Sequence, residues 1–204
     1  MGTTTFFLVR HALKEKAIGD VPITPWGILQ AQSTARRFCN LPIAVILSSP
    51  LLRAKETADH IGLETKSTIN VDARLRERAN WGDLQGQTFD EFVAMWERCT
   101  REPEYIPPVG DSAKQAGQRL SSLLSELAMQ HPSQSNIVIV THGGLITDFL
   151  VHTFPKNELD ACHSNFISVQ SELIPECSIT TLNYENGKYK IEDFASVEHL
   201  KSLS

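Results

Sequence analysis

The sequence predicts an α/β fold in three layers, with a mostly parallel central sheet flanked by helices and antiparallel strands at its C-terminal edge. Short apolar runs alternate with helix-like segments along the chain, which is typical of parallel strands joined by helices. Residues 174–194 instead resemble a β-hairpin, with Glu185-Asn186-Gly187 at the turn. The 204 residues, of which 41% are hydrophobic and 21% charged, suffice for one sizeable core, so we expect a single domain over residues 1–204.

The first predicted strand covers residues 4–10, an apolar and β-rich run. A polar loop follows it. Thr24 and Pro25 then predict a helix start, because threonine caps helix N-termini and proline fits the first helical position. We expect this helix to continue to about Cys39.

The second predicted strand covers residues 44–47 and stops at Ser48-Ser49-Pro50. A serine followed by proline predicts another capped helix, which we expect to end at Gly62. Residues 64–88 look like a loop with one short extended piece near 69–71.

The second half of the chain continues the alternation. We predict amphipathic helices at 88–101 and 112–130, a strand at 137–141, and a helix from Gly143 to about His152. Three prolines between residues 103 and 108 exclude a helix there. Residues 80–112 are therefore expected to form a small cap or insert over one face, and the polar tail after Ala195 is expected to be mobile.

Composition excludes several kinds of partner. The formal net charge of -5 does not favour nucleic acid or an anionic membrane. No apolar stretch approaches the roughly 20 residues of a membrane span, and the N-terminus lacks the pattern of a secretory signal. The four cysteines are far apart and form no CxxC, so we interpret them as reduced thiols of a cytoplasmic protein.

Two predicted strands end in a histidine. Arg10 and His11 follow the first apolar run, and His142 follows the run at 137–141. Because ligands bind at the carboxyl ends of strands in open parallel sheets, we expect these side chains to converge there. Gly143 opens a predicted helix, where backbone N–H groups and the helix dipole favour an anion. The pattern indicates an anionic substrate that meets a nucleophile and cations.

Further charged residues could join this edge. Arg53 lies in the first turn of the helix after Pro50, and its forked guanidinium suits phosphate oxygens. Glu77 is the preferred candidate for a proton donor, with Asp72 and Asp83 as rivals. Lys14 and Lys16 could face an acidic substrate, although a solvated loop is slightly favoured.

These segments and those around them resemble the histidine phosphatase, or phosphoglycerate mutase-like, superfamily. Residues 8–12 (LVRHA) are similar to its R-H-G signature, and residues 141–144 (THGG) to its second-histidine motif. Residues 24–31 (TPWGILQA) and 49–58 (SPLLRAKETA) resemble two of its helix entries, while residues 75–77 (LRE) resemble its acid segment. These motifs occur in the family's order and cover residues 5 to about 150.

The resemblance, which is to the phosphatase branch, implies the phosphoglycerate mutase-like fold and a mechanism. His11 would attack phosphorus and form a phosphohistidine. Arg10, Arg53 and His142 would bind the phosphate and stabilise charge on its oxygens. Glu77 would protonate the leaving group and then activate water. No metal or other cofactor is required, and the expected partner is a small phosphorylated substrate, with a homodimer possible.

Two departures from the family pattern leave alternatives open. The first motif ends in Ala12 instead of glycine, and the Ser and Asn that follow R-H-G in the mutase branch are absent from residues 12–17. We therefore favour hydrolysis of a small phosphorylated metabolite. A phosphoglycerate-type mutase and a catalytically impaired phosphate-binding or regulatory protein are the alternatives.

Overall fold

The computed structural model describes residues 2–203, and in that range the strands form one six-stranded sheet with the order β3-β2-β4-β1-β5-β6. The strands are β1 (Thr4–Arg10), β2 (Ile43–Ser48), β3 (Ile69–Val71), β4 (Asn136–Thr141), β5 (Ile179–Glu185) and β6 (Lys188–Ser196). The helices are α1 (Pro25–Phe38), α2 (Leu52–Thr65), α3 (Phe89–Arg101), α4 (Ala113–Gln130), α5 (Gly143–Thr153), α6 (Lys156–Cys162) and α7 (Phe166–Val169), with short 3-10 turns η1 (Ala73–Leu75), η2 (Gln170–Glu172) and η3 (Glu198–Leu203).

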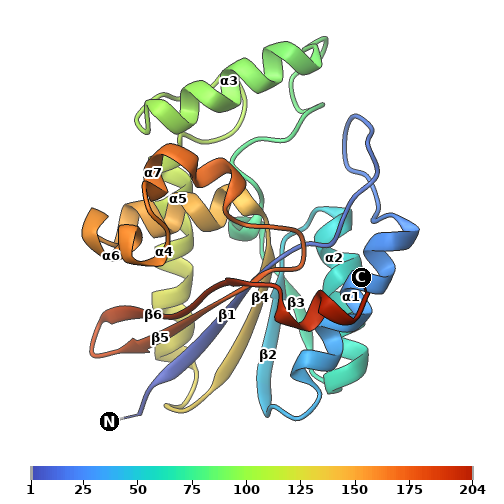
Figure 1. The fold of residues 1–204 in the computed structure, drawn as a ribbon, viewed down its shortest axis with the longest axis vertical. Coiled ribbons are helices and arrows are strands. Elements are labelled where there is room, and N and C mark those ends of the chain that lie inside the picture. The colour runs from blue at the N-terminus through green and yellow to red at the C-terminus, as the bar shows by residue number, and fades with distance from the viewer. Residues whose placement is uncertain (1, 204) are drawn as a thin grey trace.

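The sheet is parallel on one side and antiparallel on the other. Strand β1 pairs parallel with β4, β4 with β2, and β2 with β3. Strands β5 and β6 form the predicted hairpin and extend the sheet antiparallel from β1. The carboxyl ends of β1, β2 and β4 therefore lie together at the upper edge of the sheet in Figure 1. The predicted mixed α/β architecture is confirmed.

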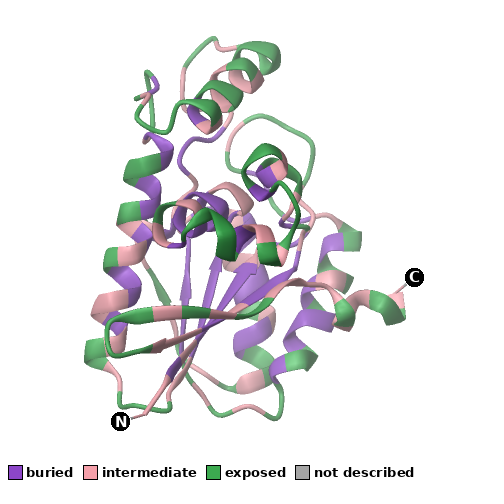
Figure 2. Ribbon diagram, turned by 60° about the vertical axis from the view of Figure 1, so that its left-hand side comes forward, coloured by how far each residue is buried: buried purple, intermediate pink, exposed green. Residues whose placement is uncertain are grey.

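Alternating side chains of the strands bury both faces of the sheet. Phe6 and Leu8 of β1 belong to a core shared with α4 and α5, whereas Phe7 and Val9 belong to a second core shared with α1 and α2. This period of two is what a strand covered on both faces requires. Figure 2 shows the inner strands buried between the two helical layers, whereas the edge strand β6 is largely exposed or half-buried.

Capping confirms three of the predicted helix starts. The Thr24 side chain accepts the Gly27 N–H before α1. Thr88 and Ser112 form reciprocal capping boxes before α3 and α4, which satisfy N–H groups that have no partner within the helix.

The predicted bounds of the second helix are wrong at both ends. Leu51 is the N-cap, and its apolar side chain makes no capping bond. The Ser49 hydroxyl instead accepts the Leu51 N–H just before the helix. At the other end the helix passes Gly62, which packs against Ile69, and stops where Lys66 adopts a left-handed conformation.

The C-terminal region is more ordered than predicted. The tail after Ala195 forms η3, which packs on α1, and Ser33 of α1 donates a hydrogen bond to the His199 carbonyl at 2.5 Å. The prediction of a mobile tail is wrong because these contacts immobilise it. Between α5 and β5, the short helices α6 and α7 cover one end of the core, and their weak patterns were not predicted.

Helix α3 lies above the carboxyl edge of the sheet, apart from the two helical layers (Figure 1). Within α3 only Cys99 is buried. The helix falls inside the cap predicted at residues 80–112.

No helix within residues 2–203 is both long enough and apolar enough to cross a membrane. All four cysteines are unpaired.

Candidate active site

His11 lies at the end of β1, where the backbone N–H of this residue donates to the Thr141 carbonyl of β4 at 2.9 Å. Nδ1 of the imidazole is 2.7 Å from the Ala12 carbonyl oxygen. A carbonyl oxygen only accepts hydrogen bonds, so Nδ1 carries the ring proton. Nε2 is then the unprotonated nitrogen, and it accepts from Arg53 Nε at 3.2 Å. Burial, and then the charges of Arg53 and Arg10, hold the pKa of His11 well below its usual value. His11 is therefore a neutral imidazole with its lone pair directed toward a guanidinium.

Ala12 fits the position where the family motif has glycine. Its N–H donates to Thr57 Oγ1 at 3.0 Å, and its methyl group lies in a small core with Ile23 and Ala31. Its backbone is not among those with positive φ in the described chain. The methyl group is accommodated inside the protein, so it does not obstruct the imidazole.

Arg53 comes from the first turn of α2 and is 3% exposed. Besides the contact with His11, its Nη2 donates to Asn80 Oδ1 at 3.2 Å. Burial lowers the pKa of the guanidinium, while the carboxylate charges of Glu77 and Asp20 oppose that shift. Sequence reasoning missed Asn80, because nothing in its local pattern indicates that it orients an arginine 27 positions earlier.

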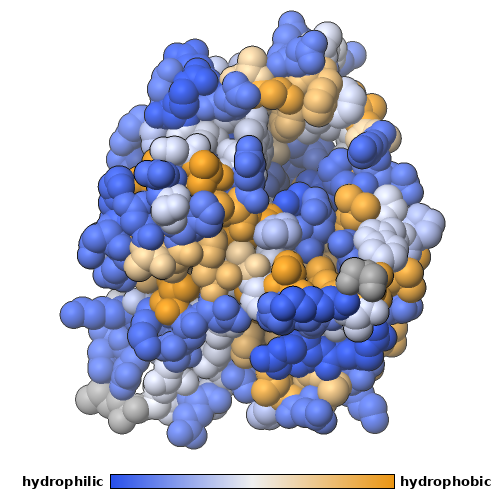
Figure 3. Space-filling view, viewed as in Figure 1, coloured by the Kyte–Doolittle hydropathy of each residue, from blue (hydrophilic) through white to orange (hydrophobic). Residues whose placement is uncertain are grey.

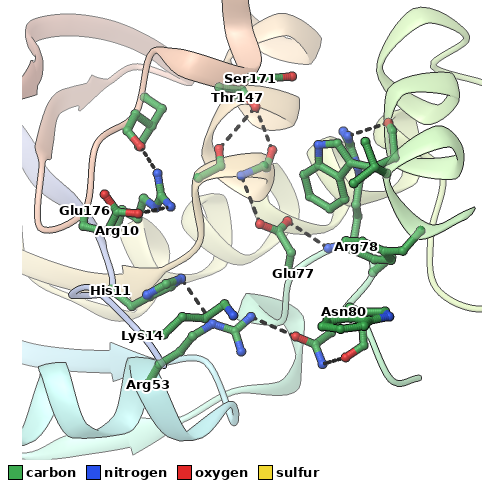
Figure 4. A pocket seen from close by; sticks show the side chains of 18 of the residues that line it. Arg10, His11, Lys14, Arg53, Glu77, Arg78, Asn80, Thr147, Ser171 and Glu176 are labelled. Atoms are coloured by element: carbon green, nitrogen blue, oxygen red, sulfur yellow. Dashed lines mark hydrogen bonds and ion pairs between the residues drawn. The ribbon is translucent and has the colours of Figure 1, made fainter. Parts of the chain in front are cut away.

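Arg10 is oriented by the segment that precedes β5. Its two terminal nitrogens donate to the Ile174 carbonyl and to the Glu176 carboxylate, each at 2.5 Å. These contacts hold the guanidinium beside Glu176, in the wall of the cavity that also includes His11 (Figure 4).

His142 follows β4, and its ring lies edge-on to that of His11 with centroids 5.1 Å apart. Its Nε2 is 2.7 Å from Ser49 Oγ, which also accepts the Leu51 N–H at 3.3 Å. In the tautomer in which this hydroxyl donates to Nε2, the proton of His142 lies on Nδ1. Burial and the neighbouring His11 and Arg53 lower the pKa of His142 well below its usual value. Ser49, expected from sequence to cap a helix, instead orients this histidine.

The structure separates the three candidate acids. Glu77 lines the cavity next to His11, and its carboxylate accepts the N–H groups of Arg78 and Gly144, both at 3.0 Å. Asp83 is held by both terminal nitrogens of Arg76, at 2.9 and 2.8 Å. Asp72, the remaining candidate, caps η1 and pairs with the arginine two residues later. Only Glu77 among these three is in the cavity.

These side chains surround a cavity of about 440 Å³. Arg10, His11, Arg53 and Gly143 line its base. Its opposite wall comes from α3 and the loop before it, and consists mainly of aromatic side chains: Trp81, Phe89, Phe92 and Trp96. Figure 3 shows the surface hollowed below α3, with hydrophobic side chains along the cap. His142 does not itself line the cavity but lies buried beside His11.

Among the buried nitrogens without a hydrogen-bond partner in residues 2–203, three lie around His11: Arg10 Nε, Arg53 Nη1 and His142 Nδ1. Arg78, which also lines the cavity, has an unpartnered Nε as well. Buried polar groups without partners are rare in proteins and call for an explanation. The three come from different segments and surround one nucleophilic imidazole. An anion held beside His11 would offset the unsatisfied polarity of these nitrogens. Among residues 2–203, no group of three or more His, Cys, Asp or Glu side chains could hold a metal ion.

Two histidines and two arginines thus lie together at the carboxyl ends of the parallel strands. The model of the histidine phosphatase superfamily (branch 1) matches residues 6–196. The chain belongs to this superfamily, and the phosphatase prediction is confirmed at the level of the family.

Named relatives include both phosphatases and mutases. A putative phosphoserine phosphatase 2 from Hydrogenobacter thermophilus is 32% identical over 155 residues, covering 69% of this chain and 73% of the relative. A probable phosphoglycerate mutase from Yersinia pestis is 32% identical over 150 residues, covering 67% and 68%. Among solved structures, phosphoserine phosphatase from Entamoeba histolytica in complex with phosphoserine superposes with a TM-score of 0.74 at 24% identity, covering 97% of this chain and 99% of that one.

Proposed function

We propose that this protein hydrolyses a small phosphorylated metabolite, a phosphomonoester, through a phosphohistidine on His11. The observation that carries the proposal is the state of that imidazole. It is neutral, its Nδ1 is tied to a backbone carbonyl, and its Nε2 lies against Arg53 in the cavity. A nucleophile needs an unprotonated nitrogen, and the guanidinium that now donates to Nε2 would bind the anion to be attacked.

In the first step His11 Nε2 forms a bond to phosphorus while the bond from phosphorus to the ester oxygen breaks. Glu77, in its acid form, donates a proton to the departing alkoxide. In the second step water attacks the phosphohistidine, and the Glu77 carboxylate takes the proton of that water. Inorganic phosphate leaves and His11 returns to its starting state, so no metal or other cofactor takes part.

Charge on the phosphoryl oxygens increases during both steps. Arg10 Nε, Arg53 Nη1 and His142 Nδ1 are among the buried nitrogens that have no partner in the described chain, and an anion next to His11 would offset their unsatisfied charge and polarity. The backbone at Gly143, at the start of α5, adds the positive end of the helix dipole. Donors that are fixed before the reaction stabilise the transition state without rearranging.

The experiment compares wild type with His11→Ala on p-nitrophenyl phosphate and tests for an acid-labile phosphorylated protein after rapid quenching. We expect turnover and the label in wild type, and neither in the variant. His163→Ala, which removes an exposed histidine that does not line the cavity, should behave as wild type. Turnover by His11→Ala above about 1% of wild type would contradict the proposal, because loss of a nucleophile costs orders of magnitude.

The mutase alternative has support from the mutase-named relative. A mutase must retain the phosphoryl group on histidine and return it to another hydroxyl. Interconversion of 2- and 3-phosphoglycerate faster than phosphate release would favour the mutase. We expect phosphate release to dominate, because residues 12–17 lack the serine and asparagine of the mutase branch.

We also propose a cytoplasmic location, which the four unpaired thiols support. The homodimer stays a prediction, and sedimentation velocity of the purified protein would measure it.

A further inference from the structure

Lys14 lies on the wall of the cavity, three residues after His11. Its side chain is partly buried and extends beside the Arg53 guanidinium (Figure 4). The sequence slightly favoured a solvated loop for this residue, and the structure instead places it next to the anion site.

The backbone on both sides of Lys14 is fixed. The Leu13 N–H donates to the Gln30 side chain at 2.9 Å, and the Leu13 carbonyl accepts the Thr24 N–H at 2.8 Å. The Glu15 N–H donates to the Pro22 carbonyl at 2.9 Å. The position of the lysine is therefore part of the fold, and binding an anion there requires little ordering of the loop.

The charge of Lys14 is not balanced by its surroundings. Its ammonium donates to the Glu15 backbone carbonyl at 3.2 Å, and within residues 2–203 no carboxylate forms an ion pair with it. Burial, then Arg53, then Arg10 all lower the pKa of Lys14. A cation beside two other cations is unfavourable until an anion binds between them.

The reacting phosphoryl group does not need this cation. The three unpartnered nitrogens of Arg10, Arg53 and His142 and the start of α5 already supply donors for its oxygens. Lys14 comes from the loop after β1 and lines the same cavity beside Arg53 (Figure 4). Its ammonium is therefore an additional cation of the cavity, available to a part of the substrate outside the phosphoryl group.

We propose that Lys14 binds a second anionic group of the substrate, a carboxylate or a second phosphate on the alcohol portion. This inference rests on the proposed function and narrows its substrate class to phosphomonoesters of anionic alcohols. Lys14 thus acts as a specificity-determining residue.

The test measures kcat/KM for two matched pairs of esters. 3-Phosphoglycerate against glycerol 3-phosphate isolates a carboxylate, and fructose 1,6-bisphosphate against fructose 6-phosphate isolates a second phosphate. We expect wild type to prefer the more anionic member in one pair. Lys14→Met should reduce that preference about tenfold, the effect of one charge-assisted hydrogen bond, and Lys14→Arg should retain most of it.

Lys16 also lines the cavity, at a more exposed position of the same loop, so Lys16→Met tests whether the effect is specific to Lys14. We expect it to keep the preference within about threefold, since exposed charges act weakly through solvent. Lys14→Gln provides the same measurement if the methionine variant does not fold.

The assignment is overturned if wild type shows no preference in either pair, if Lys14→Met lowers both members of a pair equally, or if Lys16→Met has the same effect as Lys14→Met. Wild type that hydrolyses p-nitrophenyl phosphate but shows no preference would overturn this inference alone. Wild type that hydrolyses none of the esters and forms no phosphohistidine would overturn the proposed function as well.

Discussion

Gly144, the second residue of α5, is the position where one added methyl group should reduce activity while the fold is retained. A Cβ built there would lie 2.5 Å from Trp96 Cη2 and 2.7 Å from Glu77 Oε1, closer than real Cβ contacts come. The Gly144 N–H also donates to the other oxygen of Glu77 at 3.0 Å. Gly144→Ala must therefore displace the carboxylate from its position.

The size of the effect follows from these contacts. Moving Glu77 Oε1 out to an ordinary contact of about 3.4 Å requires a shift of about 0.7 Å. Since a misplacement of about 1 Å in an active site can cost 100-fold, we expect a loss of about 30-fold in kcat, or ~2 kcal/mol. Alanine is the better helix former by about 1 kcal/mol, which offsets part of the strain in the folded state. The melting temperature should change by less than about 5 °C.

The assay compares an alkyl phosphate with p-nitrophenyl phosphate. The alkyl ester has a poor leaving group that needs the proton of Glu77, so it should lose far more rate than the nitrophenyl ester. Gly62→Ala is the control: its Cβ would lie 2.6 Å from Ile69 Cδ1, a flexible methyl end remote from the cavity, and activity should be unchanged. Equal losses on both esters, or a loss explained by unfolding, would refute the reasoning.

Three further predictions concern charge. Arg53→Lys should lower kcat/KM about 100-fold, because a lysine cannot contact His11 and hold phosphate at the same time. Near wild-type kinetics and unchanged vanadate inhibition would contradict this. The pKa values of His11 and His142 are lowered in the folded state, so the unfolded protein binds protons more readily below its histidine pKa of 6.5. The folded state therefore keeps its full stability above pH 6.5 and loses it as the pH falls. Calorimetry should show a melting temperature that drops between pH 7 and pH 5, and that drops less in His142→Gln. Arg78→Met leaves Asp148 buried without its partner, now 2.6 Å away, and should cost about 3–5 kcal/mol in urea unfolding, whereas adding Asp148→Leu should restore part of that loss.

The convergence of Arg10, His11 and His142 could be predicted from the sequence. Each follows an apolar run that reads as a buried strand, and parallel strands place their carboxyl ends at one edge. Arg10 pairs with Thr141 in the register of β1 and β4, so the ends of these two strands lie side by side. Arg53 was predictable only through the motif around it.

The orientation of these groups could not be predicted. Ser49 has the sequence signature of a helix cap, and only the packing of α2 against β4 reveals that it holds His142. Likewise, Glu77 and Asp83 are both acids in one loop, and the path of that loop decides that one faces the cavity and the other pairs with Arg76. Such contacts join residues distant in the chain, so local pattern carries no signal for them.

The dependence of Arg10 on Ile174 and Glu176 has a consequence for biosynthesis. These partners are synthesised 164 and 166 residues after the arginine that they orient. A nascent chain therefore contains both histidines and both arginines well before the first guanidinium is locked in place. Ribosome-bound and prematurely terminated products that stop short of residue 174 would be inert, and catalysis would begin only once the final hairpin has been translated and paired with β1.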